Sequence, residues 1–439
     1  MKKKYRIILY TSIFLLCVVA SIILVVKKSN SVYEEESKPK VVKHKSMLSM
    51  NLEQTAGSGD YKTVTQSSWP TEGYKFNAEL SKCENGSTLS WDDTKKAVIM
   101  QGNVSDKCYV YFDIWIPSIA DYCTSGTDLA TCVKNFGDQG PSVSNIYIHN
   151  SSLTNGAGDN SYRYAGANPN NFVCFGSDAS PCPIDNLYRI IGVFGENYHG
   201  ANGKQLVKLI KYDYMTTDEL GTDGDYSQTY KEWGMDSTYK GTYGDGERIG
   251  VYYWNYKATE SATNTWSTSL LNKTNLNTNF INNIGTTWAN KIATVTWKVG
   301  GNTWANIGTK TSSVAYTNEI TNPVTTNTTD NATTYSAKIG LMYVSDYGFA
   351  ASPDAWTLTM SSYNNTTATN NNWMYMGLYE WTISRYADYS DIAFGVGSDG
   401  NVNNAGVYDY SGVRASFNLE SSVSYVSGSG SMSDPIVIN

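Results

Sequence analysis

The chain has 439 residues and a formal net charge of −7 at pH 7, which limits both its architecture and its partners. Its length exceeds that of an ordinary single domain, so two or three domains are expected. The negative net charge argues against nucleic-acid binding, which requires a basic face to displace counterions from phosphates. The 34 tyrosines and 12 tryptophans, beside only 17% charged residues, are typical of β-rich extracellular domains with aromatic surfaces.

An uncharged apolar run covers residues 7–26, with basic residues on both sides. Twenty helical residues span about 30 Å, the thickness of the hydrocarbon core of a bilayer. We therefore predict a single-pass transmembrane anchor in residues 1–28, with the membrane as a partner. A cleavable signal peptide is the alternative, because Val18 and Ala20 satisfy the small-residue rule for cleavage, but the apolar run continues to Val26.

All cysteines except Cys17 fall in three near-neighbour pairs: Cys83 and Cys108, Cys123 and Cys132, Cys174 and Cys182. An even number of cysteines in a membrane-tethered chain predicts disulfides and an oxidising exterior. Zinc is the alternative, but the chain has no C-x-x-C motif and no histidine beside a pair. The bulk of the chain is therefore expected outside the membrane, with no metal and no cofactor.

The chain after the anchor changes composition three times. Residues 29–45 are charged and lack apolar periodicity, which predicts a solvated stalk. Residues 46–116 contain short alternating segments separated by turn residues, which predicts a small antiparallel sandwich of the immunoglobulin or fibronectin type, acting as a spacer. Residues 117–160 read as a connector with a short helix, and residues 161–439 as the distal domain.

Periodicity predicts several elements in the distal domain. Strands are expected at residues 187–194 and 205–211, and a buried strand at residues 338–343. A helix start or tight turn is expected at residues 345–351. The 3.6-residue period of residues 266–284 predicts an amphipathic helix with Leu270 among its buried positions.

The stretch from Asn372 to Glu420 contains a hairpin signal. Residues 392–396 alternate as a strand, and Asp399-Gly400 follows as a turn of the kind that joins hairpin strands. A polar and aromatic run covers residues 401–411, and a second alternating strand covers residues 413–419. Trp373 and Trp381 are expected in the core, and Arg414 in a buried ion pair with an acidic residue such as Asp346 or Glu380.

Four segments carry a resemblance to a known family: residues 187–194 (LYRIIGVF), 338–351 (KIGLMYVSDYGFAA), 373–385 (WMYMGLYEWTISR) and 413–420 (VRASFNLE). They resemble a family of surface proteins from gut Firmicutes. They are also similar to the C-type lectin-like fold of formylglycine-generating enzymes and of diversity-generating retroelement variable proteins. Ala415 replaces the usual proline, and Ile383 interrupts the usual hydroxyl pair. The resemblance implies an α+β C-type lectin-like C-terminal domain and a bacterial cell membrane location.

Enzyme chemistry and metal sites are not supported by the motifs. The chain has no cysteine after Cys182, so the oxidase chemistry of the formylglycine-generating enzymes is not expected. The acidic clusters at residues 223–225 and 399–403 lack the spacing of a calcium loop, so turns are preferred. An acidic pair such as Asp388 and Asp391 would be needed for a carbohydrate-active enzyme, which is the least favoured alternative.

The polar and aromatic residues after Trp381 combine rigid rings with adaptable hydrogen-bonding groups, as paratopes do. We predict from them a surface that binds an extracellular protein or glycan, in a protein that is not an enzyme. The predicted residues are Arg385, Tyr386, Asp388, Tyr389, Asn401, Asn403, Asn404, Tyr408 and Tyr410. The alternative is a structural envelope protein without a discrete ligand, in which these loops are only solvated.

Overall fold

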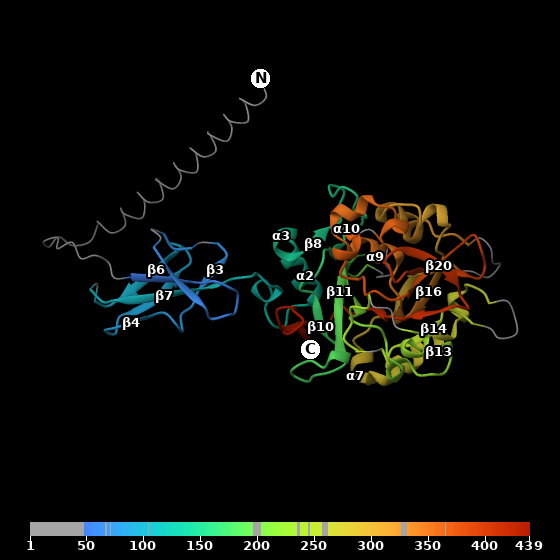
Figure 1. Ribbon diagram of the computed structural model, residues 1–439, viewed down its shortest axis with the longest axis horizontal. Helices are drawn as coiled ribbons and strands as arrows, with labels where there is room; N and C mark the ends of the chain where they lie inside the picture. Colours follow the sequence, from blue (N-terminus) through green and yellow to red (C-terminus); the bar gives the residue numbers. More distant parts are fainter. Residues whose placement is uncertain are drawn as a thin grey trace, which may run out of the picture. The chain divides into compact units, whose positions relative to one another are not determined.

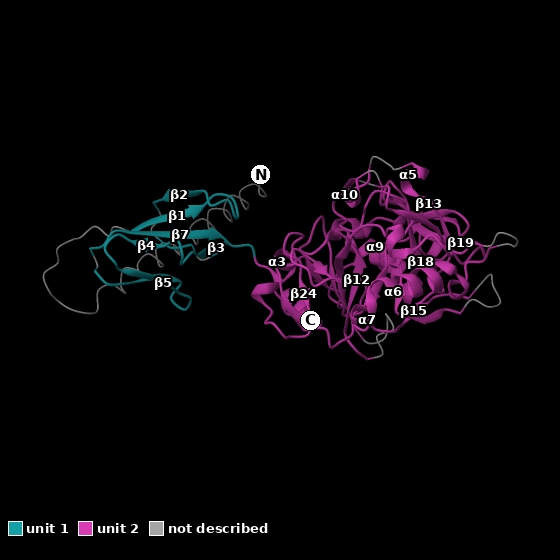
Figure 2. Ribbon diagram, turned by 90° about the horizontal axis from the view of Figure 1, so that it is seen from below, with its two compact units in different colours: residues 1–116 teal, residues 117–439 magenta. Residues whose placement is uncertain are grey.

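The computed structural model divides the chain into two compact units, residues 1–116 and residues 117–439 (Figure 2). The described residues are 48–65, 68–70, 72–103, 105–195, 203–234, 238–244, 246–256, 262–325, 332–364 and 366–439. The regular elements described in the first unit are all β-strands, and the second unit combines β-sheets with short helices. No helix within these ranges is long and apolar enough to cross a membrane, and the predicted anchor and stalk lie outside them.

The first unit is a five-stranded sheet with a separate hairpin (Figure 1). The sheet contains β1 (Leu48–Glu53), β2 (Tyr61–Val64), β3 (Tyr74–Phe76), β4 (Lys82–Cys83) and β7 (Cys108–Ile114), and the hairpin contains β5 (Thr88–Asp92) and β6 (Ala97–Gln101). Alternate residues of β7 are buried, and the ring of Phe112 contacts those of Trp69, Phe76 and Trp91. The alternating pattern therefore places one face of β7 in the core, as a two-layer β unit requires.

The pairing of β1 with β7 differs from the predicted antiparallel arrangement, because these two strands are parallel. β1 is the first described strand of the unit and β7 is the last. Because they are parallel, the chain runs in the same direction along the sheet in both strands. Parallel strands begin at the same edge, and the chain therefore starts β1 and leaves β7 at opposite ends of the sheet. This geometry suits the predicted spacer role.

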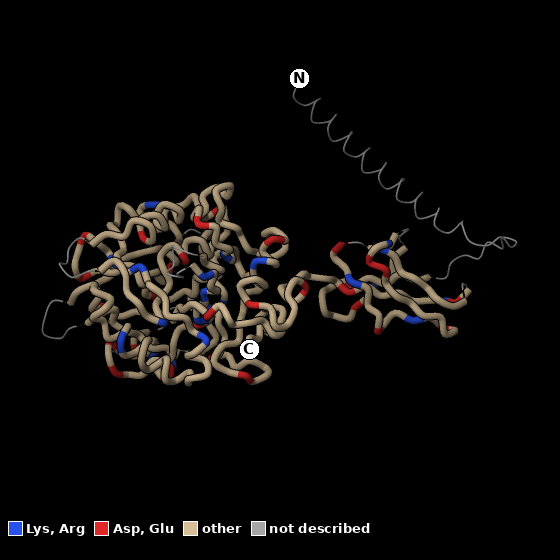
Figure 3. The backbone as a smooth tube through the Cα atoms, turned by 180° about the vertical axis from the view of Figure 1, so that it is seen from behind, with Lys and Arg blue, Asp and Glu red and all other residues tan. Residues whose placement is uncertain are grey.

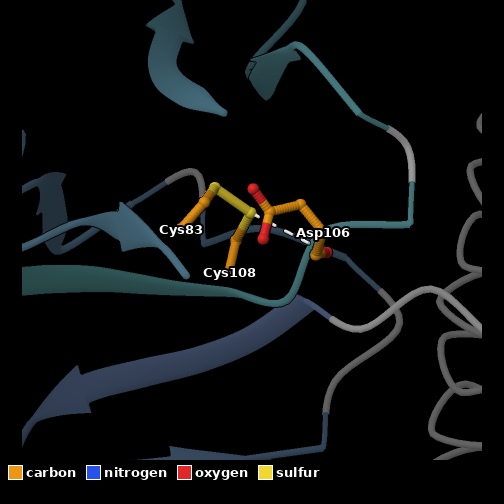
Figure 4. Close-up of side chains that lie close together, drawn as sticks. All are labelled: Cys83, Asp106 and Cys108. Carbon is orange, nitrogen blue, oxygen red and sulfur yellow. Dashed lines mark hydrogen bonds between the residues drawn. A yellow bond between two sulfur atoms is a disulfide. The ribbon is translucent and has the colours of Figure 1, made fainter. Parts of the chain in front are cut away.

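All three predicted disulfide pairs are confirmed: Cys83–Cys108, Cys123–Cys132 and Cys174–Cys182. Cys83 and Cys108 lie beside Asp106 in the first unit (Figure 4), a grouping that could in principle bind a metal ion. The two sulfur atoms are bonded to each other, so neither is a thiolate ligand. The Asp106 carboxylate instead accepts backbone hydrogen bonds from Asn85 and Ser87, which closes the loop before β7.

The second unit contains two large sheets. The seven-stranded sheet has the order β17-β22-β12-β11-β9-β8, and β10 also pairs with β11, the long strand at its centre in Figure 1. Its strands are β8 (Ile146–Ile148), β9 (Tyr162–Tyr164), β10 (Phe172–Cys174), β11 (Leu187–Phe194), β12 (Leu206–Lys211), β17 (Ile339–Gly340) and β22 (Ser416–Asn418). The predicted strands at 187–194 and 205–211 are thus confirmed, and every residue of β11 and β12 is buried.

The six-stranded sheet has the order β13-β14-β21-β18-β19-β20. Its strands are β13 (Tyr226–Thr229), β14 (Gly250–Tyr253), β18 (Glu380–Arg385), β19 (Ile392–Val396), β20 (Val402–Gly406) and β21 (Tyr410–Gly412). Two smaller ribbons pair β15 (Val295–Lys298) with β16 (Thr334–Ala337), and β23 (Tyr425–Ser427) with β24 (Val437–Ile438). Trp373 and Trp381 are buried, as predicted.

The helices of the second unit are short. They are α2 (Leu129–Gly137), α3 (Pro141–Ser144), α4 (Thr217–Leu220), α5 (Tyr230–Trp233), α6 (Ile281–Asn283), α7 (Gly285–Ala289), α8 (Ser312–Tyr316), α9 (Val344–Ala350) and α10 (Thr366–Asn370). α2 buries Leu129, Val133 and Phe136 against the seven-stranded sheet, so residues 117–160 belong to the core of this unit. At residues 345–351, where a helix start or tight turn was predicted, the structure has helix α9.

The amphipathic helix predicted at residues 266–284 is broken in the structure. Residues Trp266–Thr268 form a 3₁₀ turn, and a π-helical segment covers Leu271–Phe280 before α6. The buried carboxylate of Asp225 accepts hydrogen bonds from the backbone N–H groups of Leu270 and Leu271, which starts the long segment there. Leu270 is consequently 42% exposed and not in the core, which corrects the prediction.

Buried cations and carboxylates connect the elements of the second unit, where many Lys and Arg positions lie in the interior (Figure 3). Nε of Arg414 lies 2.8 Å from a carboxylate oxygen of Glu380 on β18, which confirms the predicted ion pair. Asp346 does not pair with Arg414, since its carboxylate forms ion pairs with Lys208 and Arg163. Each of these side chains is at least 98% buried, so the pairs are screened little by water.

Glu319 links three parts of the unit through one buried carboxylate. Its two oxygens accept hydrogen bonds from the backbone N–H groups of Val344 and Ser345, at 2.9 Å each, at the start of α9. The hydroxyl of Ser384 on β18 also donates to it. Burial raises the pKa of Glu319 to about 7, although the backbone donors act in the opposite direction.

We expect Arg414→Met to lower the free energy of unfolding by about 3–5 kcal/mol at pH 7, because it leaves Glu380 buried without its counterion. Urea unfolding of the full-length protein measures the loss. The double variant Arg414→Met/Glu380→Leu should recover part of it, since no unpaired charge remains. Arg248→Met removes the two exposed ion pairs with Asp185 and Asp218 and should cost no more than about 1 kcal/mol. If Arg414→Met lowered the free energy of unfolding no more than Arg248→Met does, the prediction would be contradicted.

Glu319 should make the folded state more stable in mild acid than at neutral pH. Its pKa is about 7 when folded and near 4.5 when unfolded, so only the folded state holds this proton between those values. Stability therefore falls as pH rises from 4.5 to 7, by about 3 kcal/mol for this group.

The variant Glu319→Gln cannot titrate, so the difference between wild-type and variant unfolding free energies isolates this contribution. Buried His149, whose pKa is lowered by burial, acts in the opposite direction and cancels in that difference. Urea titrations at several pH values measure it. A difference that stays constant from pH 4.5 to 7 would show that Glu319 is ionised throughout.

Candidate functional site

The predicted hairpin is present, but its second strand is not the predicted one. β19 pairs with β20 from Ile392↔Gly406 to Val396↔Val402, and the turn contains Gly400 at φ +92°. β20 is drawn from the polar run, whereas β22 within residues 413–419 joins the seven-stranded sheet. β20 lies at the edge of its sheet, where polar side chains remain solvated, so an alternating apolar pattern is not required.

The nine predicted site residues differ widely in exposure. Asp388, Tyr389, Asn403 and Tyr408 are exposed, and Tyr386, Asn401, Asn404 and Tyr410 are partly buried. Arg385 is buried, and its guanidinium donates to the backbone carbonyl of Val324. Burial lowers the pKa of Arg385 to about 10, and the side chain lies in the interior, away from any surface ligand.

The predicted residues also lie at two different ends of the hairpin. Tyr386, Tyr389 and Tyr408 are next to the Ile392↔Gly406 end, whereas Asn401 is at the turn beyond Val396↔Val402. Five strand residues separate these ends by about 15 Å. Tyr386 packs on Tyr389, with ring centroids 5.7 Å apart, and burial together with its hydrogen bond to Asp388 raises the pKa of Tyr386 to about 12. The predicted residues are therefore spread along the hairpin, and Arg385 is not at its surface.

A continuous row of partly exposed rings lies instead along the six-stranded sheet, and we call it the aromatic strip. It consists of Tyr256, Tyr253, Tyr410, Trp233 and Tyr379. Successive ring centroids are 4.5, 6.0, 5.2 and 5.7 Å apart in that order. Tyr256 is 40% exposed and Tyr379 is 45% exposed, so the two ends of the strip present their rings to solvent.

Strand pairing places the rings of the strip together. Tyr253 of β14 lies opposite Tyr410 of β21 in the antiparallel register, and side chains opposite each other project from the same face. Thr229 caps α5 by accepting a hydrogen bond from the backbone N–H of Glu232, which fixes the turn that carries Trp233. Tyr379 directly precedes β18, whose first residue pairs with β21.

A small core supports the strip from beneath. It contains Tyr214, Tyr230, Ile249, Val251, Met376 and Leu378, all of them buried, and Trp233 and Tyr410 pack against it. The hydroxyl of Tyr230 donates to the backbone carbonyl of Tyr379. The strip is therefore held by packing and hydrogen bonds, and its rings need little ordering when a ligand binds.

Four residues of the strip were not predicted from the sequence: Trp233, Tyr253, Tyr256 and Tyr379. The first three lie in or just beyond residues 216–250, a stretch whose sequence is rich in acidic residues, glycine and tyrosine. The high density of tyrosines there is a usable signal, because tyrosine is only intermediate in its tendency to be buried. Only pairing with β21 shows that they meet Tyr410.

The chemistry of the strip suits binding more than catalysis. Its rings offer flat apolar faces with hydroxyl groups at their edges, and such side chains carry much of the energy at recognition surfaces. The predicted acidic residue Asp388 accepts a hydrogen bond from the backbone N–H of Trp304, a structural contact.

Comparisons of the chain with protein-family models, curated proteins and solved structures gave no match. The resemblance to C-type lectin-like surface proteins therefore stays a prediction from the sequence.

Proposed function

We propose that the chain is a membrane-anchored bacterial surface protein whose second unit, a C-type lectin-like domain, binds an extracellular glycan through the aromatic strip. The observation that carries the proposal is the row of five adjoining rings with exposed ends. The C–H faces of sugar rings pack on aromatic faces, and tyrosine hydroxyls at the ring edges donate hydrogen bonds to sugar hydroxyls.

The length of the strip favours an extended ligand. Five rings with successive centroids 4.5 to 6.0 Å apart form an extended row of faces and edges, which matches a chain of sugar units better than a single small molecule. The rings are also pre-positioned by the core beneath them, so binding energy is not spent on ordering. A protein ligand is the other outcome of the test.

The proposed location is supported by the disulfides and by the sequence. Three cysteine pairs at bonding distance fit an oxidising compartment outside the membrane. The apolar run at residues 7–26 has the length of a membrane span.

We expect the variant Tyr256→Ala/Tyr379→Ala to lose about tenfold or more in glycan affinity, because it removes the two exposed rings. Full-length protein with oxidised cysteines is screened on a glycan array, and each hit is then measured by calorimetry. Both side chains are partly exposed, so the melting temperature should change little.

The matched control is Tyr389→Ala, which removes a tyrosine that is 58% exposed and lies outside the strip. It should bind as the wild type does. A loss confined to Tyr389→Ala would move the site to the loop at residues 386–389. A folded protein that binds no glycan but associates with itself would favour the structural envelope function.

A further inference from the structure

The second unit contains a cavity of about 240 Å³ whose charge differs from that of the whole chain. Its walls come from the loop before β10, from β11 and from residues 369–376. Arg189 and Lys240 line it, and none of the described residues in its lining is Asp or Glu. The cavity is thus positively charged in a chain with a net charge of −7.

Arg189 is 4% exposed and is held in a fixed orientation. Its guanidinium lies between the rings of Phe172 and Trp373, 4.4 and 4.6 Å from their centroids. Nε donates to the side-chain oxygen of Asn171 at 2.7 Å, and Nη2 donates to the carbonyl of Pro169 at 2.8 Å. The stacking and these hydrogen bonds leave the cation little freedom to move.

The acceptors around Arg189 are neutral. Besides Asn171 and Pro169, they are the side chain of Asn168 and the carbonyl of Trp373, and no described carboxylate forms an ion pair with it. Four acceptor contacts surround a group with five N–H donors, so one N–H on Nη1 stays available. Burial lowers the pKa of Arg189 to about 9, so the side chain remains charged at neutral pH.

A buried charge without a counterion is costly, and most of the other buried cations among the described residues lie beside a carboxylate. Arg414 pairs with Glu380, and Lys208 pairs with Asp346. Arg189 departs from this arrangement while lining a cavity. An anionic ligand in the cavity would supply the missing counterion.

Lys240 adds a second cation at the exposed rim of the cavity. Its Nζ lies 4.3 Å from the ring centroid of Tyr375 and donates to the carbonyl of Thr369 at 3.3 Å. Its backbone N–H donates to the carbonyl of Met376 at 2.9 Å, which fixes this segment against the wall. No carboxylate of the described residues forms an ion pair with Lys240 either.

We propose that this cavity binds the carboxylate of an acidic monosaccharide, either free or at the end of a glycan. A cavity of about 150 Å³ holds benzene, so the volume here suits one substituted six-membered ring. The carboxylate meets the available N–H of Arg189 and the ammonium of Lys240 through charge-assisted hydrogen bonds. The rings of Trp373 and Tyr375 provide apolar wall for the sugar ring.

The test compares two sugars that differ in one group. D-glucuronate carries a carboxylate where D-glucose carries a hydroxymethyl group, and both are titrated by calorimetry into the full-length protein. We expect glucuronate to bind at millimolar concentrations and glucose not to bind. Added sodium chloride should weaken glucuronate binding by screening the cations.

Lys240→Gln should weaken glucuronate binding by about three- to tenfold, because it removes one charge-assisted contact. Lys310→Gln, which removes an exposed lysine outside the cavity, should leave binding unchanged. Arg189→Gln should abolish binding. If this variant fails to fold, the comparison of Lys240→Gln with Lys310→Gln still tests the proposal. The aromatic-strip variant Tyr256→Ala/Tyr379→Ala should bind glucuronate normally, since the two sites share no side chain.

Two results would overturn the proposal: equal binding of glucuronate and glucose, including no binding of either, or equal effects of Lys240→Gln and Lys310→Gln. A glucuronate-terminated disaccharide distinguishes the two sources of the ligand. Tighter binding of the disaccharide supports the end of a glycan, and equal binding supports the free acid.

Discussion

The arrangement of the second unit depends on the buried ion pair between Arg414 and Glu380. Residues 413–415 carry the chain from β21 of the six-stranded sheet to β22 of the seven-stranded sheet, so Arg414 lies at the crossing between them. Glu380 on β18 fixes it from one sheet, and the carbonyl of Met374 accepts a second hydrogen bond at 2.7 Å. Leaving either charge unpaired in the interior is costly, so the pair stabilises the observed crossing between the sheets.

The same pair positions the segment that serves both candidate sites. Met374 is held by Arg414, and its neighbours Trp373 and Tyr375 form part of the cavity wall. A few residues later, Met376 and Leu378 enter the small core, and Tyr379 joins the aromatic strip. Within seven residues this stretch contributes side chains to the cavity wall, to the small core and to the aromatic strip. This explains why it is so rich in large side chains. A change at the crossing would disturb both sites together.

Sequence patterns correctly predicted the features that depend on residues close together in the chain. Continuous apolar runs gave β11 and β12, the Asp399-Gly400 turn gave the hairpin, and cysteine spacing gave the disulfides. Predictions were wrong where the conformation or burial of a residue depends on a residue far away in the sequence. Asp225 accepts hydrogen bonds at the start of the helical segment at Leu271 from more than forty residues earlier, and the buried Arg385 donates to the carbonyl of Val324, also distant in the sequence. The aromatic strip likewise requires the pairing of β14 with β21, which no local pattern specifies.

Charge distribution narrows the kind of acidic ligand that the cavity can accept. The chain carries 40 acidic and 33 basic residues, and several of the basic ones are buried in ion pairs. Each buried ion pair removes one charge of each sign, so the solvent-facing surface keeps the negative balance of the chain, and it repels polyanions at distances below the screening length of about 8 Å at physiological salt. Arg189 and Lys240 act only at short range, inside and at the rim of the cavity. A ligand with one isolated carboxylate on a neutral body gains this attraction without the repulsion, which favours an acidic sugar at the end of an otherwise uncharged glycan over a continuous polyuronate.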